Sequence, residues 1–326
     1  MPSKIEWTDE TWNVVTGCTK VSAGCTHCYA ERMSKRLAGR CGYPKDDPFR
    51  VTLHPDKLDK PLKWKKPRKI FVNSMSDLFH EDVPDEFIDE VFAVMSDAGQ
   101  HTFMILTKRP ERMKQYLSLD NPRYTARKVF NLTKDPAGKF DCDLHWPLIN
   151  VWLGTSVENQ AAADERIPPL LQVPAAVKFI SVEPLLGPVD LMSVQFGKYT
   201  TMNVLEGCGI SLKSPCQSIP NAFSNKIDWV ITGGESGPGA RPLHPDWVRS
   251  LRDQCQAAGT KFFFKSWGDW LPNAQEYDCN PGGVDYEQKH ELVRNVAMCR
   301  VGKKKSGRLI DGRTWDEMPE IGGQHA

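Results

Sequence analysis

The chain has 326 residues, of which 40% are hydrophobic and 25% are charged, and its formal net charge is +1 at pH 7. This balance is typical of a globular protein with a sizeable core and argues against a generally basic nucleic-acid-binding protein. No apolar run reaches membrane-spanning length and the N-terminus has no secretory core, so we expect a cytoplasmic protein without a membrane partner. In that reducing compartment the ten cysteines should be ligands or free thiols.

Seven short apolar segments are predicted to be β-strands, and helical patterns follow most of them. The strands are expected at Thr11–Thr16, Lys69–Val72, Thr102–Leu106, Asn150–Leu153, Val177–Ile180, Asp228–Ile231 and Lys261–Phe264. The helices are expected at Tyr29–Ala38, at Pro84–Ala98, from Pro110, up to Leu171 and at about Pro245–Ala258. This alternation indicates parallel strands covered by helices.

We therefore predict an α/β fold, a partial or open (β/α) TIM-like barrel of about six to seven parallel strands. A doubly wound open sheet is the second choice. The barrel should span residues 1–270, with polar insertions over the C-terminal rim at about 119–149 and 187–226. Residues 271–326 show no clear periodicity and are predicted to be a C-terminal extension or cap.

Three cysteines, Cys18, Cys25 and Cys28, lie close together between the first predicted strand and the first predicted helix. Soft thiolates bind iron–sulfur clusters, zinc or Cu(I), and three of them leave one coordination position open. Cys28 also lies near a helix N-terminus, where the dipole favours negative charge. We predict that the trio holds a [4Fe–4S] cluster with one open iron. A structural zinc site with His27 as fourth ligand is the alternative.

Two further sequence features give weaker predictions. The segment from Lys57 to Lys69 carries seven basic residues around Trp64, which suits a phosphate backbone, although a solvated loop gives the same pattern. Cys208 and Cys216 could bind a second metal together with Cys279 or Cys299, but a pair at this spacing is far less specific than the first trio.

Segments spread over nearly the whole chain, apart from the two insertions, resemble those of a known family. They resemble the phage-associated radical-SAM-like proteins, a three-cysteine phage protein family long described as a domain of unknown function. The resemblance is carried by residues 5–8, 12–13, 16–19, 25–32, 71–79, 106–112, 181–188, 233–237, 263–268 and 312–316.

The resemblance implies a radical S-adenosylmethionine enzyme. In such enzymes S-adenosylmethionine binds the open iron of the three-cysteine [4Fe–4S] cluster, and one electron then yields a 5′-deoxyadenosyl radical. An electron donor of the flavodoxin or ferredoxin type is implied as a partner. The phage association and the basic segment favour a nucleobase, nucleotide or nucleic acid as substrate, while the catalytic residue stays unassigned. A zinc-stabilised nucleic-acid-binding protein without catalysis and a redox-sensing iron–sulfur subunit are the alternatives.

Cofactor-binding residues are expected where the strands end. The superfamily usually carries Gly-Gly-Glu after its second strand, but here residues 73–77 occupy that place, and their oxygens can accept from an ammonium group. Lys108 or Arg109 could pair with the cofactor carboxylate. Gly233 and Gly234 allow close backbone approach to a ligand, or simply form a tight turn. The complete predicted set is Asn73, Ser74, Ser76, Asp77, Lys108, Ser156, Glu183, Gly233, Gly234 and Glu235.

Overall fold

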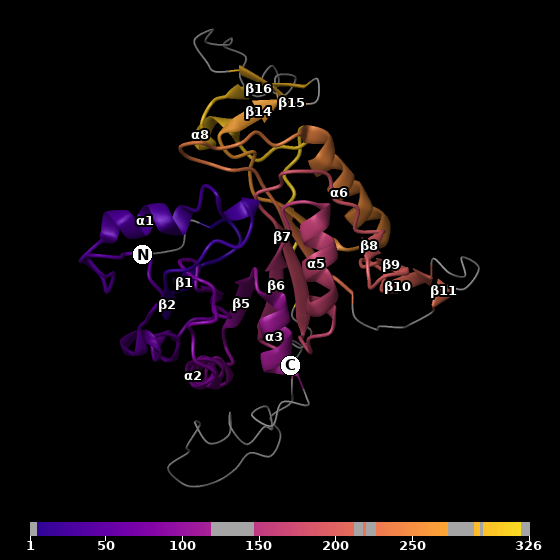
Figure 1. The fold of residues 1–326 in the computed structure, drawn as a ribbon. Helices are drawn as coiled ribbons and strands as arrows, with labels where there is room; N and C mark the ends of the chain where they lie inside the picture. The colour runs from indigo at the N-terminus through magenta and orange to yellow at the C-terminus, as the bar shows by residue number, and fades with distance from the viewer. Residues whose placement is uncertain are drawn as a thin grey trace. The chain divides into compact units, whose positions relative to one another are not determined.

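The computed structural model describes residues 5–118, 147–211, 218–219, 226–272, 290–293 and 296–320. Its main sheet has seven strands, hydrogen-bonded in the order β1-β4-β5-β6-β7-β12-β13. Strands β1, β5, β6 and β7 of this sheet are labelled in Figure 1. The strand pairings described within this sheet are parallel. The strands are β1 (Glu10–Trp12), β4 (Lys69–Val72), β5 (Thr102–Thr107), β6 (Val151–Ser156), β7 (Val177–Val182), β12 (Trp229–Thr232) and β13 (Lys261–Phe264).

The strand order decides between the two predicted architectures. The seven strands follow one another in the sheet as they do along the chain, without a reversal. A doubly wound sheet has a switch point at which the order reverses, whereas a singly wound sheet is a segment of a barrel. The fold is therefore an open (β/α) barrel of seven parallel strands, as predicted, and the doubly wound alternative is wrong.

The predicted helices are confirmed, with small shifts at their ends. They are α1 (Tyr29–Leu37), α2 (Asp85–Asp97), α3 (Pro110–Leu117), α5 (Gln160–Leu171) and α6 (Pro245–Ala258). The ends of α6 follow local rules, because the ring Nδ1 of His244 accepts from the backbone N–H of Asp246 at its start. At its end Gly259 takes a left-handed conformation with φ of 66°.

The prediction of one strand over Thr11–Thr16 is wrong. Strand β1 ends at Trp12, and β2 (Val15–Thr16) pairs with β3 (Thr52–Leu53) in a separate two-stranded sheet. The side-chain Oδ1 of Asn73 accepts the backbone N–H groups of Val14 and Val15, both at 3.0 Å. A distant side chain thus binds the backbone where the chain leaves the main sheet and enters β2.

The chain divides into two compact units. Unit 1 comprises Met1–Thr155, Pro169–Lys178 and Ile321–Ala326, and unit 2 comprises Ser156–Pro168 and Phe179–Glu320. In unit 1 the buried rings of Trp12 and Phe103 pack with centroids 5.7 Å apart. In unit 2 Trp229 packs against Phe179 at 5.7 Å. Within the described residues no helix combines the length and apolar character needed to cross a bilayer.

Two smaller sheets lie in the regions that the sequence left without assigned elements. Residues 187–226 contain an antiparallel sheet of order β11-β10-β9-β8, whereas residues 119–146 of the other insertion lie outside the described part. The C-terminal region contains a sheet of order β14-β16-β15 and the short helix α8 (Lys303–Ser306), and Asp316 forms an antiparallel bridge with Phe263 of β13. The strands are β8 (Val194–Gln195), β9 (Thr200–Asn203), β10 (Cys208–Ser211), β11 (Ser218–Ile219), β14 (Trp270–Pro272), β15 (His290–Val293) and β16 (Val296–Arg300).

Candidate functional site

Residues 17–28, which we call the cysteine loop, follow β2 in unit 1. Gly17 begins the loop with φ of 85°, and a Cβ there would lie 2.1 Å from the carbonyl oxygen of Arg50, so the position accepts only glycine. The backbone N–H of Gly17 donates to the Met75 carbonyl at 3.1 Å, and the Ser76 hydroxyl donates to the Gly17 carbonyl at 2.6 Å. The start of the loop is thereby fixed to the segment that follows β4.

The three thiols of the loop are all partly buried. Cys25 ends the short helix η1 (Ala23–Cys25), and Cys28 occupies the N-cap position of α1. The predicted place of Cys28 at a helix N-terminus is therefore confirmed. Cys28 also packs against a small apolar cluster that contains Ala30 and Met75.

Arg109 connects this loop to the end of β5. Its Nη1 donates to the Cys18 sulfur at 3.5 Å, and its Nη2 donates to the Thr19 hydroxyl at 2.7 Å. The same guanidinium pairs with Asp77 at 3.3 Å and with Glu81 at 2.9 Å. Only 10% of the Arg109 side chain is exposed, so its contacts with Cys18 and Asp77 are partly buried, whereas its partner Glu81 is 62% exposed. Arg109 is a positioning residue for the cysteine loop.

Asp77 holds Arg109 in turn and completes the link between neighbouring strand ends. Its Oδ1 accepts from the Thr107 hydroxyl at 2.7 Å, and its Oδ2 accepts from the backbone N–H of Lys108 at 3.0 Å. The carboxylate is 5% exposed. The structure therefore places Asp77 beside the predicted site, where its oxygens bind the protein's own donors.

The surroundings act differently on two of the thiols. Burial raises the pKa of Cys18 to about 11, the charge of Asp77 acts in the same direction, and Arg109 opposes both. Burial also raises the pKa of Cys25, but hydrogen bonds from the Val21 and Ser22 backbone and the charge of Lys108 outweigh it and lower the pKa overall. The surroundings thus favour the thiolate at Cys25, whereas at Cys18 they favour the neutral thiol and Arg109 offsets this only in part.

The remaining predicted residues of unit 1 lie next to the loop. The Ser74 hydroxyl donates to Asn13 Oδ1 at 3.2 Å, and Ser76 binds the Gly17 carbonyl as described. Asn73 is 3% exposed, and its Nδ2 has no hydrogen-bond partner among the described residues, although its Oδ1 is fully used. A buried amide donor without a partner is unusual in a folded protein.

The predicted residues of unit 2 form a second group, in which charged side chains are paired. Glu183 accepts from the Lys265 ammonium at 2.6 Å, and Gly233 lies next to both side chains. The Glu235 carboxylate accepts from the backbone and the guanidinium of Arg241. Ser156 is 4% exposed, and its carbonyl accepts from Arg166 at 3.0 Å. Glu158, another strand-end candidate, forms a buried ion pair with the same arginine at 2.8 Å.

The glycines of unit 2 have a packing role. A Cβ on Gly234 would lie 2.1 Å from the Trp267 carbonyl oxygen, and one on Gly268 would lie 2.0 Å from the Glu235 carbonyl oxygen. Gly234 N–H also donates to the Ser266 carbonyl at 2.9 Å. The ends of β12 and β13 therefore lie backbone against backbone, which supports the tight-turn interpretation of this motif.

The donor chemistry of the cysteine loop fits a thiolate-bound cluster. Three thiols belong to one loop, Arg109 donates to the Cys18 sulfur, and backbone N–H groups and Lys108 stabilise Cys25 as a thiolate. Hydrogen bonds to sulfur are among the contacts that tune iron–sulfur clusters. In the described part of the chain no group of three or more His, Cys, Asp and Glu side chains is arranged to hold a single metal ion.

The chain matches one protein family over almost its entire length. This family is described as "Protein of unknown function (DUF5131)", and the match covers residues 2–319. The chain belongs to this family. No match was found among curated proteins.

Solved structures that are similar to this DUF5131 chain include mutant forms of spore photoproduct lyase. One mutant form has 11% sequence identity and a TM-score of 0.38, covering 94% of this chain and 72% of that chain. Another, with bound AdoMet and dinucleoside spore photoproduct, has 10% identity and a TM-score of 0.39, covering 89% and 67%.

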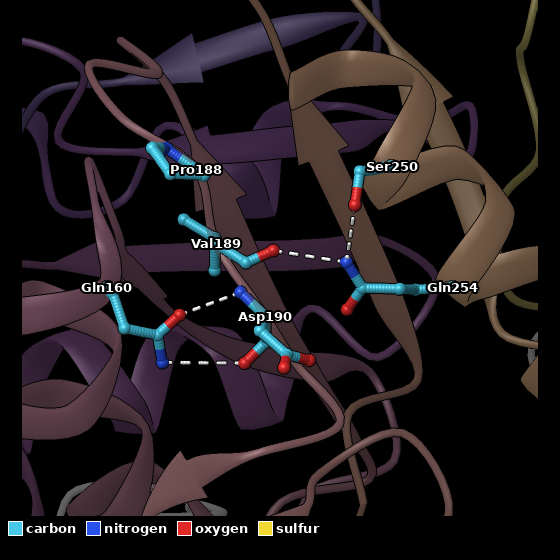
Figure 2. A pocket seen from close by; sticks show the side chains of 6 residues that line it. All are labelled: Gln160, Pro188, Val189, Asp190, Ser250 and Gln254. Atoms are coloured by element: carbon cyan, nitrogen blue, oxygen red, sulfur yellow. Dashed lines mark hydrogen bonds between the residues drawn. The ribbon is translucent and has the colours of Figure 1, made fainter. Parts of the chain in front are cut away.

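A cavity of about 520 Å³ lies in unit 2 of this DUF5131 chain, away from its predicted residues (Figure 2). Gln160 of α5 accepts from the backbone N–H of Asp190 at 2.7 Å, and Gln254 of α6 donates to the Val189 carbonyl at 3.1 Å. Gln254 also donates to Ser250 at 3.0 Å. Because both amides bind the protein's own groups, we assign no ligand to this cavity.

Sequence reasoning missed part of the site. It offered Arg109 only as a partner of the cofactor carboxylate, and it did not anticipate Thr19 or His80, whose Nε2 lies 2.9 Å from the Thr19 hydroxyl. The signal that could have found Thr19 is its position directly after Cys18. Of the second proposed metal site, Cys216 and Cys279 lie outside the described residues, while Cys208 faces Glu206 and Cys299 is buried.

Proposed function

We propose that this chain is a radical S-adenosylmethionine enzyme that acts on a nucleobase, a nucleotide or a nucleic acid. The cysteine loop carries the proposal. Three partly buried thiols follow the first strand of an open (β/α) barrel, and side chains from the ends of β4 and β5 hold the loop. In barrels of this kind the C-terminal strand ends carry the active site.

Cys18, Cys25 and Cys28 would hold the [4Fe–4S] cluster. When bound, the cluster supplies the electron that cleaves S-adenosylmethionine, and a flavodoxin or ferredoxin would renew that electron. Arg109 orients Cys18 and donates to its sulfur, while Lys108 favours the thiolate of Cys25. Asp77 and Ser76 serve the same site by fixing Arg109 and Gly17.

The residues proposed to bind S-adenosylmethionine fall into two groups, one in each unit. Ser74 and the partnerless amide of Asn73 are the candidates in unit 1. Glu183, oriented by Lys265, is the candidate for a ribose hydroxyl in unit 2, together with Ser156. Gly233, Gly234 and Glu235 would form the turn that supports Glu183, because the Leu185 N–H donates to the Gly233 carbonyl at 3.3 Å.

The substrate class rests on a different feature. The segment of residues 57–69 carries seven basic residues in a chain with a net charge of only +1. Concentrated positive charge of this kind suits the phosphates of a nucleotide or nucleic acid. The resemblance to phage-associated proteins supports the same substrate class.

Anaerobic purification and reconstitution test the cofactor. We expect a brown protein with iron and sulfide in equal amounts, and we expect a Cys18→Ala/Cys25→Ala/Cys28→Ala variant to contain neither. Cys41→Ala is the matched control, because Cys41 is an exposed thiol outside the loop and its removal should leave the iron content unchanged. One equivalent of zinc without iron would contradict the proposal and favour the zinc-stabilised binding protein.

S-adenosylmethionine cleavage tests the reaction class. The reduced, reconstituted protein should convert S-adenosylmethionine to 5′-deoxyadenosine and methionine, measured by liquid chromatography. The three-cysteine variant should yield neither product. If the cluster were fully loaded but the protein neither bound nor cleaved S-adenosylmethionine, the chain would be an iron–sulfur protein of another class.

A further inference from the structure

Residues 57–69, which we call the basic ridge, are a strongly charged part of unit 1 that the cysteine site does not use. The ridge contains seven lysines and arginines and one acidic residue, Asp59, so its charge is +6 against +1 for the whole chain. Like charges at this density repel one another, which lowers the stability of the folded chain unless an anion binds. An anionic partner would relieve this repulsion.

The backbone of the ridge is fixed to the folded core. The indole N–H of Trp12 donates to the Lys57 carbonyl at 2.8 Å, and the ring Nε2 of His101 lies 3.0 Å from the carbonyl of the buried Pro61. Two single-turn helices, η2 (Pro55–Lys57) and η3 (Pro61–Lys63), shape the segment. The ridge thus presents its side chains from a preorganised surface, which reduces the entropy lost when a partner binds.

Of the seven basic side chains of the ridge, two are paired with carboxylates of the protein, and three others are not. Lys63 pairs with Asp59, and Arg68 pairs with Glu10 while its guanidinium lies 5.2 Å from the Trp64 ring centroid. The ammonium groups of Lys60, Lys65 and Lys66 are exposed, and none of them has a carboxylate partner among the described residues. These three lysines are available to an external anion.

The ridge begins beside the strand that leads into the cysteine loop. The backbone N–H of His54 donates to the Val14 carbonyl at 2.8 Å, and the ring Nε2 of His54 lies 2.8 Å from the Thr16 hydroxyl. Burial lowers the pKa of His54, and the charge of Lys57 acts in the same direction. From there the ridge runs to the N-terminal ends of β4 and β5, where the Gln100 amide donates to the Trp64 carbonyl at 3.3 Å and the Thr102 N–H donates to the Arg68 carbonyl at 2.9 Å.

We infer that the basic ridge binds the phosphate backbone of a nucleic-acid polymer. Ammonium groups on a fixed backbone suit evenly spaced phosphates, because binding releases the counterions of the polymer. An anionic membrane would call for an apolar face as well, and Leu62 is the one large apolar side chain of the ridge that is strongly exposed. The inference deepens the proposed function by naming a polymer as the substrate, but binding needs neither cluster nor S-adenosylmethionine.

Fluorescence anisotropy with labelled DNA and RNA oligonucleotides, single-stranded and duplex, tests the inference on the full chain. We expect Lys60→Ala/Lys65→Ala/Lys66→Ala to weaken binding by about tenfold or more and to reduce the slope of log affinity against log salt by about 3. The corresponding arginine variant keeps the charge and should retain the wild-type slope. No variant should melt at a lower temperature than the wild type, because the three side chains are exposed and none of them has a carboxylate partner among the described residues.

Lys303→Ala/Lys304→Ala/Lys305→Ala is the matched control, because it removes the same charge from three exposed lysines on α8 of unit 2. This control should bind oligonucleotides as the wild type does. An unchanged salt slope in the ridge variant, or an equal loss in the α8 variant, would overturn the inference. So would loss of binding to phosphatidylserine vesicles without any loss for oligonucleotides. Oligonucleotide binding by the three-cysteine variant would support the inference about the basic ridge, even if the protein did not cleave S-adenosylmethionine.

Discussion

The strand ends of the two units carry similar polar residues but use them differently. In unit 1 Asp77 and Arg109 converge on a loop with three thiols, and Arg109 donates directly to one sulfur. In unit 2 each strand-end carboxylate is bound by a basic side chain of the same unit. The strand ends of unit 1 therefore lead to thiols that have no ion-pair partner in the described part of the chain, whereas those of unit 2 end in ion pairs. The pairs in unit 2 are Glu158–Arg166, Glu183–Lys265 and Glu235–Arg241.

The largest effect should come from filling the backbone contact between β12 and β13. Gly234→Ala would place a Cβ 2.1 Å from the Trp267 carbonyl oxygen, and neither backbone can retreat, because Gly268 is packed equally tightly against Glu235. We expect a loss of more than about 4 kcal/mol in the free energy of unfolding, measured by urea denaturation, or no folded protein.

Gly259→Ala is the control for the Gly234 substitution. Gly259 also ends a regular element, with φ of 66°, but a Cβ there would meet open space, so only the left-handed conformation is penalised. That penalty is about 1 kcal/mol. If Gly234→Ala were no more harmful than Gly259→Ala but abolished S-adenosylmethionine binding, the motif would serve a ligand rather than packing.

The second prediction compares one arginine from each unit. Arg166→Gln should cost about 3 kcal/mol of unfolding free energy, because it leaves Glu158 buried without its charge partner. Arg109→Gln should cost less, about 2 kcal/mol, because Asp77 keeps its hydrogen bonds from Thr107 and Lys108.

Hydrogen exchange distinguishes the roles of these two arginines. Only Arg109→Gln should accelerate exchange of the backbone amides in residues 18–28, because Arg109 binds both Cys18 and Thr19. Mass spectrometry of the metal-free chain measures this without any cofactor. Equal protection of the cysteine loop in both variants would mean that Arg109 stabilises unit 1 without positioning the loop.

These comparisons also show which features a sequence can predict. The bounds of α6 and β13 were predictable because each is set by a neighbouring residue: the His244 cap and Pro245 act at the start of α6, and Gly259 separates its end from β13. The break between β1 and β2 was not, because Asn73 acts on Val14 from 59 positions away. The cysteine trio is a local pattern, whereas the contact between Arg109 and Cys18 joins residues 91 positions apart. Local chemistry therefore indicated the candidate ligands, and only the fold could show which side chains contact them.

The third prediction concerns the pair Glu183 and Lys265. The side chains are 24% and 18% exposed, so a double-mutant cycle with Glu183→Gln and Lys265→Met should give a coupling energy of about 1 kcal/mol. Urea denaturation of the four proteins measures it. A coupling near zero would show that the pair does not stabilise unit 2. Glu183 would then resemble the groups beside the cysteine loop in being available to a ligand.

The smallest effect should come from the exposed ion pairs of Asp311, which is not a strand-end carboxylate. The loss of unfolding free energy there is the reference value for the other substitutions. Asp311 accepts from Arg249 at 2.7 Å and from Arg252 at 2.6 Å, and its side chain is 41% exposed. Asp311→Asn keeps the shape of the side chain and suits the left-handed φ of 51°, so only the charge is lost. We expect the free energy of unfolding to fall by about 0.5 to 1 kcal/mol.

The pH dependence of that loss identifies its cause. Hydrogen bonds from Arg249 lower the pKa of Asp311 below its ordinary value of 3.8, Arg252 adds to this, and burial opposes it. Because the folded-state pKa is the lower one, the stabilisation is complete above the ordinary value and disappears as the pH falls through the folded-state value. Urea denaturation should therefore show the full difference between Asp311→Asn and the wild type at pH 7, and a shrinking one below about pH 4. A difference that persists unchanged in acid would mean that hydrogen-bond geometry, not charge, holds this pair.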